Sequence, residues 1–254
     1  MKITITTKNL SIGYRKETIM SGINYELHSG EMTCLIGSNG VGKSTLLRTL
    51  AGFQPPIDGE ISILDRKIND FSSEELSKTI GIVLTDKPDI KEMTVEEIVS
   101  MGRTPYTNFW GTISHEDAQI IENSMAEIGI TDLRKKHFSK LSDGEKQKTM
   151  IAKTIAQQTP IILLDEPTAF LDYPSKIETM KLLKTLAHND NKTILLSTHD
   201  LELALQIADK LWLMIDDKIY TGTPQELMRN GLLPKYLQTN PKMKISPHNS
   251  TDKS

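Results

Sequence analysis

The sequence contains a single cysteine, Cys34, in 254 residues. One cysteine cannot close a disulfide within the chain, and it cannot supply a metal site made of several cysteines. Cys34 lies in the mostly apolar run Met32-Thr33-Cys34-Leu35-Ile36. Because free cysteines are among the most often buried residues, we predict a small buried residue on a strand.

Long apolar segments are also absent. Nowhere do about 18 apolar residues follow one another, so the sequence predicts no membrane-spanning helix. The opening residues, MKITITTKNL, have neither a long apolar stretch nor a small-residue cleavage site, which argues against a signal peptide. We expect a chain that is cytosolic, or one that lies at a membrane only through a partner.

Neither sign of charge dominates. The 30 Lys and Arg residues and the 33 Asp and Glu residues give a formal net charge of −3. No overall basic field therefore exists to hold nucleic acid or an anionic membrane, and we expect no nucleic-acid partner. Apolar residues make up 37% and charged residues 25%, which is typical of a globular protein rather than a disordered one.

Short apolar runs alternate with helical patterns, which indicates an α/β fold in which helices connect the strands of a sheet. Several runs are apolar at consecutive positions, as in strands that are covered on both faces. The clearest strands are expected at residues 33–36, 80–84, 161–164, 193–197 and 211–215. Three further runs, at 3–6, 23–27 and 60–64, predict an antiparallel side sheet.

The pattern becomes helical between residues 89 and 158. Helices are expected at 95–101, 115–128 and 144–157, with no convincing strand between them. Such a stretch predicts a helical lobe that is inserted into the sheet domain.

We therefore predict one domain, 1–237, with a catalytic core at 1–88 and 159–237 and the helical lobe at 89–158. The remaining residues, 238–254, are polar and contain proline, and we expect this tail to be disordered.

A glycine-rich loop follows the strand expected at 33–36 and opens a helix that we predict to run to about Phe53. Glycines let such a loop turn its N–H groups inward, and the helix N-terminus adds positive potential. Lys43 would supply a point charge to the outer phosphates of a nucleotide, and the Ser44 hydroxyl would ligate Mg²⁺. The residues that match the pattern G-x-x-x-x-G-K-[ST] are Gly37, Ser38, Asn39, Gly40, Val41, Gly42, Lys43 and Ser44. This motif predicts a nucleotide site without choosing among fold families.

Two carboxylates follow the strand expected at 161–164. In proteins with such a loop, the first acid of this element, here Asp165, holds Mg²⁺ directly or through water. The adjacent Glu166 is placed to polarise the attacking water. A solvated acidic turn is the alternative, which the glycine-rich loop disfavours. His199 follows another sheet strand, and we predict that its imidazole bonds the terminal phosphate.

One motif points to a particular family. The run Leu141-Ser142-Asp143-Gly144-Glu145 opens the helix that precedes the two carboxylates. It resembles the LSGGQ signature of ATP-binding cassette (ABC) proteins.

Other positions follow the order of that family, and the resemblance covers about residues 3 to 222. Tyr14 lies upstream, where an ABC protein stacks an aromatic ring on adenine, and the ATP-binding set extends to Thr45. Asp172 falls in the segment that corresponds to the D-loop, and His199 corresponds to the switch histidine.

The resemblance implies a P-loop NTPase (RecA-like) core with an antiparallel β side sheet and an inserted α-helical lobe. It also implies an ATPase that uses ATP and Mg²⁺ and works as a head-to-tail homodimer, with catalytic roles for Lys43, Glu166 and His199. Each ATP would be held by the loop of one chain and capped by Ser142 of the other. Hydrolysis would then remove contacts that favour the closed pair.

Two departures from the family pattern stand out. ABC proteins usually carry a glutamine after the strand at 80–84, where it touches Mg²⁺ or water, but this position is Thr85 here. Threonine has a shorter reach, so either water bridges the distance to the ion or Asp86 substitutes. We hypothesise that site closure and coupling are altered but not abolished. Asp143 and Glu145 stand where Gly and Gln are usual, and because carboxylates repel phosphate we predict that both face outward, with Lys146 offsetting part of their charge.

The segments 156–160 and 102–106 are similar to ATPases of importers for iron–siderophore complexes, haem and cobalamin. Such a relationship implies integral membrane permease subunits as partners and, indirectly, an extracytoplasmic substrate-binding protein. The chain would then lie at the cytoplasmic face of the membrane. The helical lobe would contact the permease near residues 85–92 and 102–111.

Several alternatives stay open at this stage. The chain could be a soluble ABC-type ATPase that acts on ribosomes or DNA, although it has one cassette and no sustained heptads. It could also be an ABC transporter subunit for a different substrate. A P-loop kinase would have no use for the signature motif, and Glu166 argues against a regulatory module that never hydrolyses.

Overall fold

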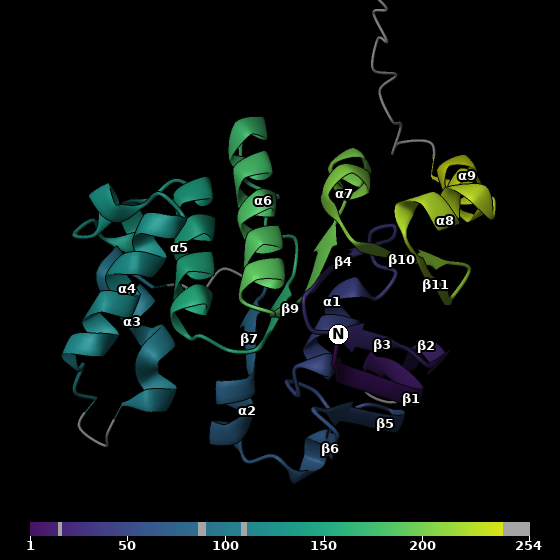
Figure 1. Cartoon of the computed structure of the whole chain (residues 1–254), viewed down its shortest axis with the longest axis horizontal. Helices are drawn as coiled ribbons and strands as arrows, with labels where there is room; N and C mark the ends of the chain where they lie inside the picture. Colours follow the sequence, from purple (N-terminus) through teal and green to yellow (C-terminus); the bar gives the residue numbers. More distant parts are fainter. Residues whose placement is uncertain (15–16, 86–89, 108–110, 241–254) are drawn as a thin grey trace, which may run out of the picture.

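Six strands form the main sheet of the computed structural model, which describes residues 1–14, 17–85, 90–107 and 111–240 (Figure 1). Their order is β11-β10-β4-β9-β8-β7, and all neighbours are parallel except β10 and β11. The bounds are β4 Glu31–Ile36, β7 Ile80–Val83, β8 Ile161–Leu164, β9 Thr193–Thr198, β10 Lys210–Ile215 and β11 Lys218–Gly222. Every residue of β4, β8 and β9 is buried, as the runs of consecutive apolar residues predict.

A second, antiparallel sheet is made of β1 Ile3–Tyr14, β2 Glu17–Ile23, β3 Glu26–His28, β5 Asp58–Ile63 and β6 Arg66–Lys67. The single strand predicted at 23–27 is wrong, because the chain forms two strands there that pair with opposite ends of β1. Asn24 separates them: its Oδ1 accepts a hydrogen bond from the backbone N–H of Asn9 at 2.8 Å. Asn9 has a φ of 45°, so β1 bends where it changes partner.

Helices fill the stretch between β7 and β8. They are α3 Val95–Ser100, the 3₁₀ helix η2 Met101–Tyr106, α4 His115–Glu127 and α5 Asp143–Ala156, with the short 3₁₀ turns η3 Thr131–Leu133 and η4 Phe138–Lys140. A buried ion pair joins two of them, since Arg103 Nε donates to Asp117 Oδ1 at 2.8 Å. Arg103 also donates to the carbonyl of Ala156 at 2.8 Å, which ties η2 to the end of α5.

The remaining helices are α1 Lys43–Leu50, α2 Ser73–Thr79, α6 Tyr173–Asn189, α7 Leu201–Ile207, α8 Pro224–Arg229 and α9 Leu232–Thr239, beside the 3₁₀ turn η1 Ile68–Asp70. The prediction that the first helix runs to Phe53 is wrong: α1 ends at Leu50, and Gly52, with a φ of 74°, turns the chain. Helix α9 continues to Thr239, past the domain end predicted at 237, and residues 241–254 lie outside the described part. Among the described helices, none has the length and apolar character that a membrane crossing requires.

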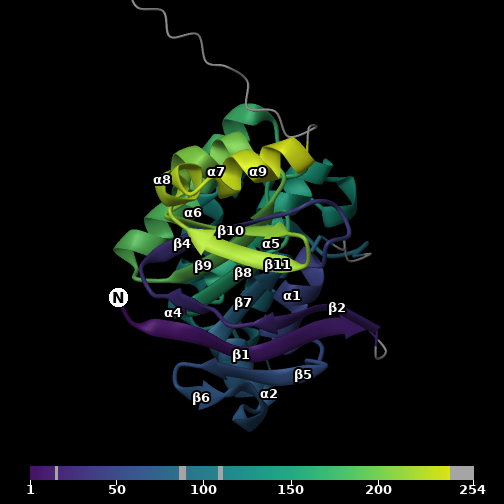
Figure 2. The ribbon, with the colours of Figure 1, turned by 90° about the vertical axis from the view of Figure 1, so that its right-hand side faces the viewer.

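The main sheet separates two apolar cores, because successive residues of a strand point to opposite faces. Leu35 and Leu163 pack with α1 and the second sheet on one face. Cys34 and Ile162 pack with α5, α6 and α7 on the other, and Cys34 is buried as predicted. Figure 2 shows this division, with α6 to α9 on one side of the strands and the second sheet on the other.

Candidate functional site

The glycine-rich loop joins β4 to α1 at the carboxyl end of the main sheet. Gly42 takes a φ of 106°, and a Cβ there would meet the side chain of Ile19 at 2.9 Å, so glycine is required at this position. The Lys43 side chain is only 5% exposed, and its ammonium donates to the carbonyls of Gly37 at 2.9 Å and Ser38 at 3.1 Å. Lys43 therefore lies folded onto the loop that it belongs to.

Asp165 and Glu166 follow β8 and are held by a residue of the adjacent strand β9. Ser197 Oγ donates to Asp165 Oδ1 at 2.7 Å and accepts from the backbone N–H of Glu166 at 2.9 Å. Glu166 has a φ of 50°, a left-handed conformation that is uncommon for a residue with a side chain. The sequence analysis missed Ser197 as a positioning residue; its signal was a hydroxyl at the end of an otherwise apolar buried strand.

His199 completes a chain of contacts that crosses three strands. Its Nε2 lies 2.5 Å from Glu166 Oε1 and 3.4 Å from Lys43 Nζ. A single ring nitrogen can donate to Glu166 or accept from Lys43, but it cannot do both at once. Burial lowers the pKa of Lys43, and the nearby charges of Glu166 and Asp165 oppose that shift.

Three other predicted residues lie around this group. Thr85 follows β7, and its hydroxyl donates to the backbone carbonyl of Asp165 at 3.2 Å. Tyr14 ends β1 and is 45% exposed, and its hydroxyl accepts from Thr45 Oγ1 at 3.2 Å, so its ring lies near the start of α1. Ser44 lies half-buried in the first turn of α1, while Asn39 is exposed at the tip of the loop.

The signature motif is located elsewhere, at the N-terminus of α5. Ser142 caps this helix: its Oγ accepts from Glu145 N–H at 3.3 Å, and its own N–H donates to Glu145 Oε2 at 2.6 Å. The Ser142 N–H is the main cause that lowers the pKa of the Glu145 carboxyl. Glu145 also pairs with Lys136 at 3.1 Å, and Lys146 lies 3.9 Å from the exposed Asp143.

The chain brings the signature together with the predicted D-loop and not with the glycine-rich loop. Ser142, Gly144 and Asp172 line one open surface cavity of about 370 Å³, with Phe170 and Lys148 beside them. A Cβ on Gly144 would meet the carbonyl of Phe170 at 3.1 Å, so the two segments lie in close contact. The sequence-predicted residues thus fall into two groups within one chain.

Comparison with known proteins identifies relatives that match over most of the chain. A family model described as ABC transporter matches residues 20–169. An uncharacterised ABC transporter ATP-binding protein of Methanocaldococcus jannaschii is 41% identical over 230 residues, which are 90% of this chain and 79% of that protein. The ferric enterobactin transport ATP-binding protein of Escherichia coli is 34% identical over 227 residues, covering 89% of this chain and 84% of that protein.

A solved structure with the same fold was determined as a dimer. It is a dimeric ATP-binding cassette in a post-hydrolysis state, bound to ADP and Pi, and it aligns with a TM-score of 0.78 at 27% identity. The alignment covers 87% of this chain and 98% of that chain. The predicted fold class is therefore confirmed.

Proposed function

This chain belongs to the ABC transporter family of ATP-binding proteins, and from that membership we propose that it drives an importer for an iron complex (siderophore or haem) or cobalamin through a separate membrane permease. It is the ATP-hydrolysing subunit. The observation that supports this proposal best is the meeting of Lys43, Glu166 and His199 at one edge of the sheet. The relative that transports ferric enterobactin favours an iron–siderophore complex as the cargo.

ATP would enter the site by replacing contacts that the chain now makes with itself. Lys43 would turn from the carbonyls of Gly37 and Ser38 to the outer phosphates, while the N–H groups of residues 37–45 surround the phosphate chain. The exposed ring of Tyr14 would stack on adenine. Gly40 and Gly42 take φ values of 77° and 106°, which residues with a side chain rarely adopt, so the loop can turn its N–H groups toward a phosphate.

The hydrolytic step is assigned to residues held by β8 and β9. Glu166 would accept the proton of the attacking water, and its backbone is fixed by Ser197. His199, already in contact with Glu166, would hydrogen-bond the terminal phosphate when it is present. The oxygen side chains of Ser44, Asp165 and Thr85 are the hard donors that Mg²⁺ prefers, and this ion, when bound, would neutralise phosphate charge.

The second copy of the chain would supply the signature residues that cap the nucleotide held by the first copy. In a head-to-tail dimer, residues 141–145 and Asp172 of one copy would face the nucleotide held by the other. The open cavity around Ser142 supports this arrangement, because Ser142 has an exposed position at a helix N-terminus that favours an anion.

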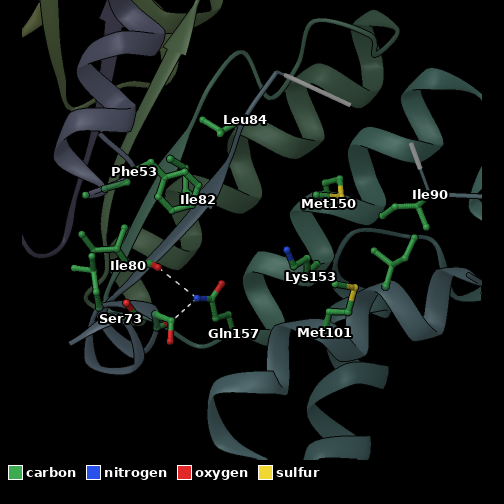
Figure 3. Close-up of a pocket in the computed structure, with 15 residues that line it drawn as sticks. Phe53, Ser73, Ile80, Ile82, Leu84, Ile90, Met101, Met150, Lys153 and Gln157 are labelled. Atoms are coloured by element: carbon green, nitrogen blue, oxygen red, sulfur yellow. Dashed lines mark hydrogen bonds between the residues drawn. The ribbon is translucent and has the colours of Figure 1, made fainter. Parts of the chain in front are cut away.

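The permease would dock between the catalytic core and the helical lobe (89–158), on the cytoplasmic face of the membrane. A cavity of about 520 Å³ lies there, between α1, α2 and β7 on one side and α3, η2 and α5 on the other (Figure 3). Its lining is mostly apolar and includes Leu84, Ile90 and Met101, which lie in or next to the segments 85–92 and 102–111. Apolar grooves of this kind accept a helix of a partner. An extracytoplasmic binding protein would act only through the permease.

The proposal is tested with Glu166→Gln. Without a general base, ATP should persist, and we expect a stable dimer in the presence of MgATP, measured by analytical ultracentrifugation. The wild-type chain in MgADP is the control and should remain monomeric. A Glu166→Gln chain that binds ATP but stays monomeric would contradict the composite site. Recovery of the wild-type chain without any permease from detergent-solubilised membranes would favour the soluble ABC ATPase instead.

A further inference from the structure

The groove between the core and the helical lobe contains one charged side chain among its described lining residues, Lys153 of α5. The rest of the lining is apolar or uncharged, with Phe53, Ile82 and Leu84 on the core side and Met101 and Met150 on the lobe side. Figure 3 shows the Lys153 nitrogen directed into the space between these walls. A cation in this position restricts the chemistry of a partner more than the apolar lining alone would.

The backbone of α5 at Lys153 is held in place by contacts on both sides. Gly102 packs so closely on α5 that a Cβ there would come within 2.2 Å of the Lys153 carbonyl oxygen. One helical turn further on, Gln157 Nε2 donates to the carbonyls of Ser77 at 2.5 Å and Ile80 at 3.3 Å, which joins α5 to the core. The Gln157 side chain is therefore occupied, and Lys153 extends from a helix that is joined to the core.

Within the described residues, Lys153 has neither an ion pair nor a side-chain hydrogen bond. Burial lowers its pKa, and no carboxylate in the described part of the chain opposes that shift. Lys153 is half-buried, whereas the buried Lys43 has carbonyl partners and nearby carboxylates. A partner that fills the groove would remove the remaining water from Lys153, which is unfavourable unless the partner compensates the charge.

We propose that Lys153 determines which permease this chain binds. The permease segment that occupies the groove is an apolar helix, and one of its carboxylates pairs with the Lys153 ammonium. The inference rests on the proposed function, since it assumes a permease in this groove. A segment without an acidic residue would leave a buried cation unpaired, and one with a basic residue would be repelled. Lys153 thus selects among permeases whose docking segments are otherwise similarly apolar.

A zero-length carbodiimide cross-link tests the contact directly. The chain would be purified from membranes together with the permease that accompanies it, treated with the carbodiimide, and digested for mass spectrometry. We expect a Lys153 peptide joined to an Asp or Glu peptide of the permease. Lys153→Arg is the matched control, because it keeps the positive charge but cannot form the amide, so the complex should persist and this cross-link should disappear.

The outcomes separate the two proposals. If the wild-type chain does not co-purify with any permease, the proposed function fails and the inference fails with it. If the complex forms but Lys153 joins no permease carboxylate, or joins a carboxylate of its own chain, the inference alone is overturned.

Affinity gives an independent measurement. Lys153→Glu should weaken binding to the permease by about tenfold or more, as expected when one member of a buried charge pair is reversed. Lys153→Met should have a smaller effect, and the same change at exposed Lys181 of α6 should have none. Basal ATPase activity should stay unchanged in all three variants, because neither lysine takes part in the hydrogen bonds that hold Lys43, Asp165, Glu166 and His199. Equal binding by Lys153→Glu and wild type would overturn the assignment.

Discussion

The glycine-rich loop and the signature motif each lie at the N-terminus of a helix, α1 and α5 respectively. The polar groups of the two segments find hydrogen-bond partners in different ways. In the loop, the buried Lys43 bonds two carbonyls of its own loop, and His199 and Glu166 lie next to it. In the signature, Ser142 and Glu145 bond each other, and the site around them is open to solvent. The site at the loop draws residues of one chain from the ends of the three strands β4, β8 and β9, whereas the signature is open to solvent.

This difference indicates how the work is divided between two copies. Residues that bind and hydrolyse the nucleotide must be positioned before it arrives, so they are placed on buried strands that fix them. In the proposed dimer the signature would leave and rejoin the site in each cycle, so its polar groups would need partners in both states. The capping box does this, since Ser142 N–H and Glu145 N–H have partners without a nucleotide.

The largest effect is expected on the loop side of this comparison, with Lys43→Met. The side chain keeps much of its length but loses the charge that would contact the phosphates, so ATPase activity should fall by about 10²–10³-fold. Nucleotide affinity should also drop, measured as the loss of the ATP-induced rise in melting temperature. A variant that retains ATP binding and more than half of the wild-type activity would contradict the placement of the site.

Ser142→Ala tests the signature side and should have an intermediate effect. Monomeric chains should bind ATP as the wild type does, because Ser142 does not contribute to their own loop. ATP-driven dimerisation should weaken by about tenfold, as expected for one lost charge-assisted hydrogen bond.

Loss of the helix cap must be separated from loss of the phosphate contact in that variant. Removing the Ser142 cap should cost about 1 kcal/mol of stability. Ser72→Ala is the matched control, since Ser72 and Glu75 form the same capping box at the start of α2. If both variants weaken dimerisation equally, Ser142 acts only through the stability of its helix.

The sequence located both motifs because each is short and opens a helix, α1 or α5. The structure places Lys43, Glu166 and His199 together, while the nucleotide roles of these residues stay predictions. The family resemblance is confirmed. What the sequence could not predict depends on contacts between distant strands. Ser197 acquires its role only because β9 pairs with β8, and the orientation of Lys153 depends on how α5 lies against Gly102. The strand predicted at 23–27 failed because its pairing depends on a bend at Asn9, which the local pattern does not reveal.

The smallest effect is expected from Glu145→Gln, which tests whether the signature's negative charge matters. Glutamine can take the place of glutamate in a capping box, so the start of α5 should be kept. The ion pair with Lys136 is partly exposed and should contribute little to stability. The remaining change is one negative charge fewer beside the position proposed for the triphosphate.

Because like charges repel, that change should strengthen ATP-driven dimerisation of the Glu166→Gln chain by about two- to fivefold at low salt, and by less at physiological salt. The measurement is the dimer dissociation constant at two ionic strengths, with Glu75→Gln in the remote capping box as the control. Weaker dimerisation would mean that the Glu145 carboxylate supports the closed pair, through Lys136 or through the Ser142 N–H. The outward orientation predicted for this carboxylate in the ATP-bound dimer would then be wrong.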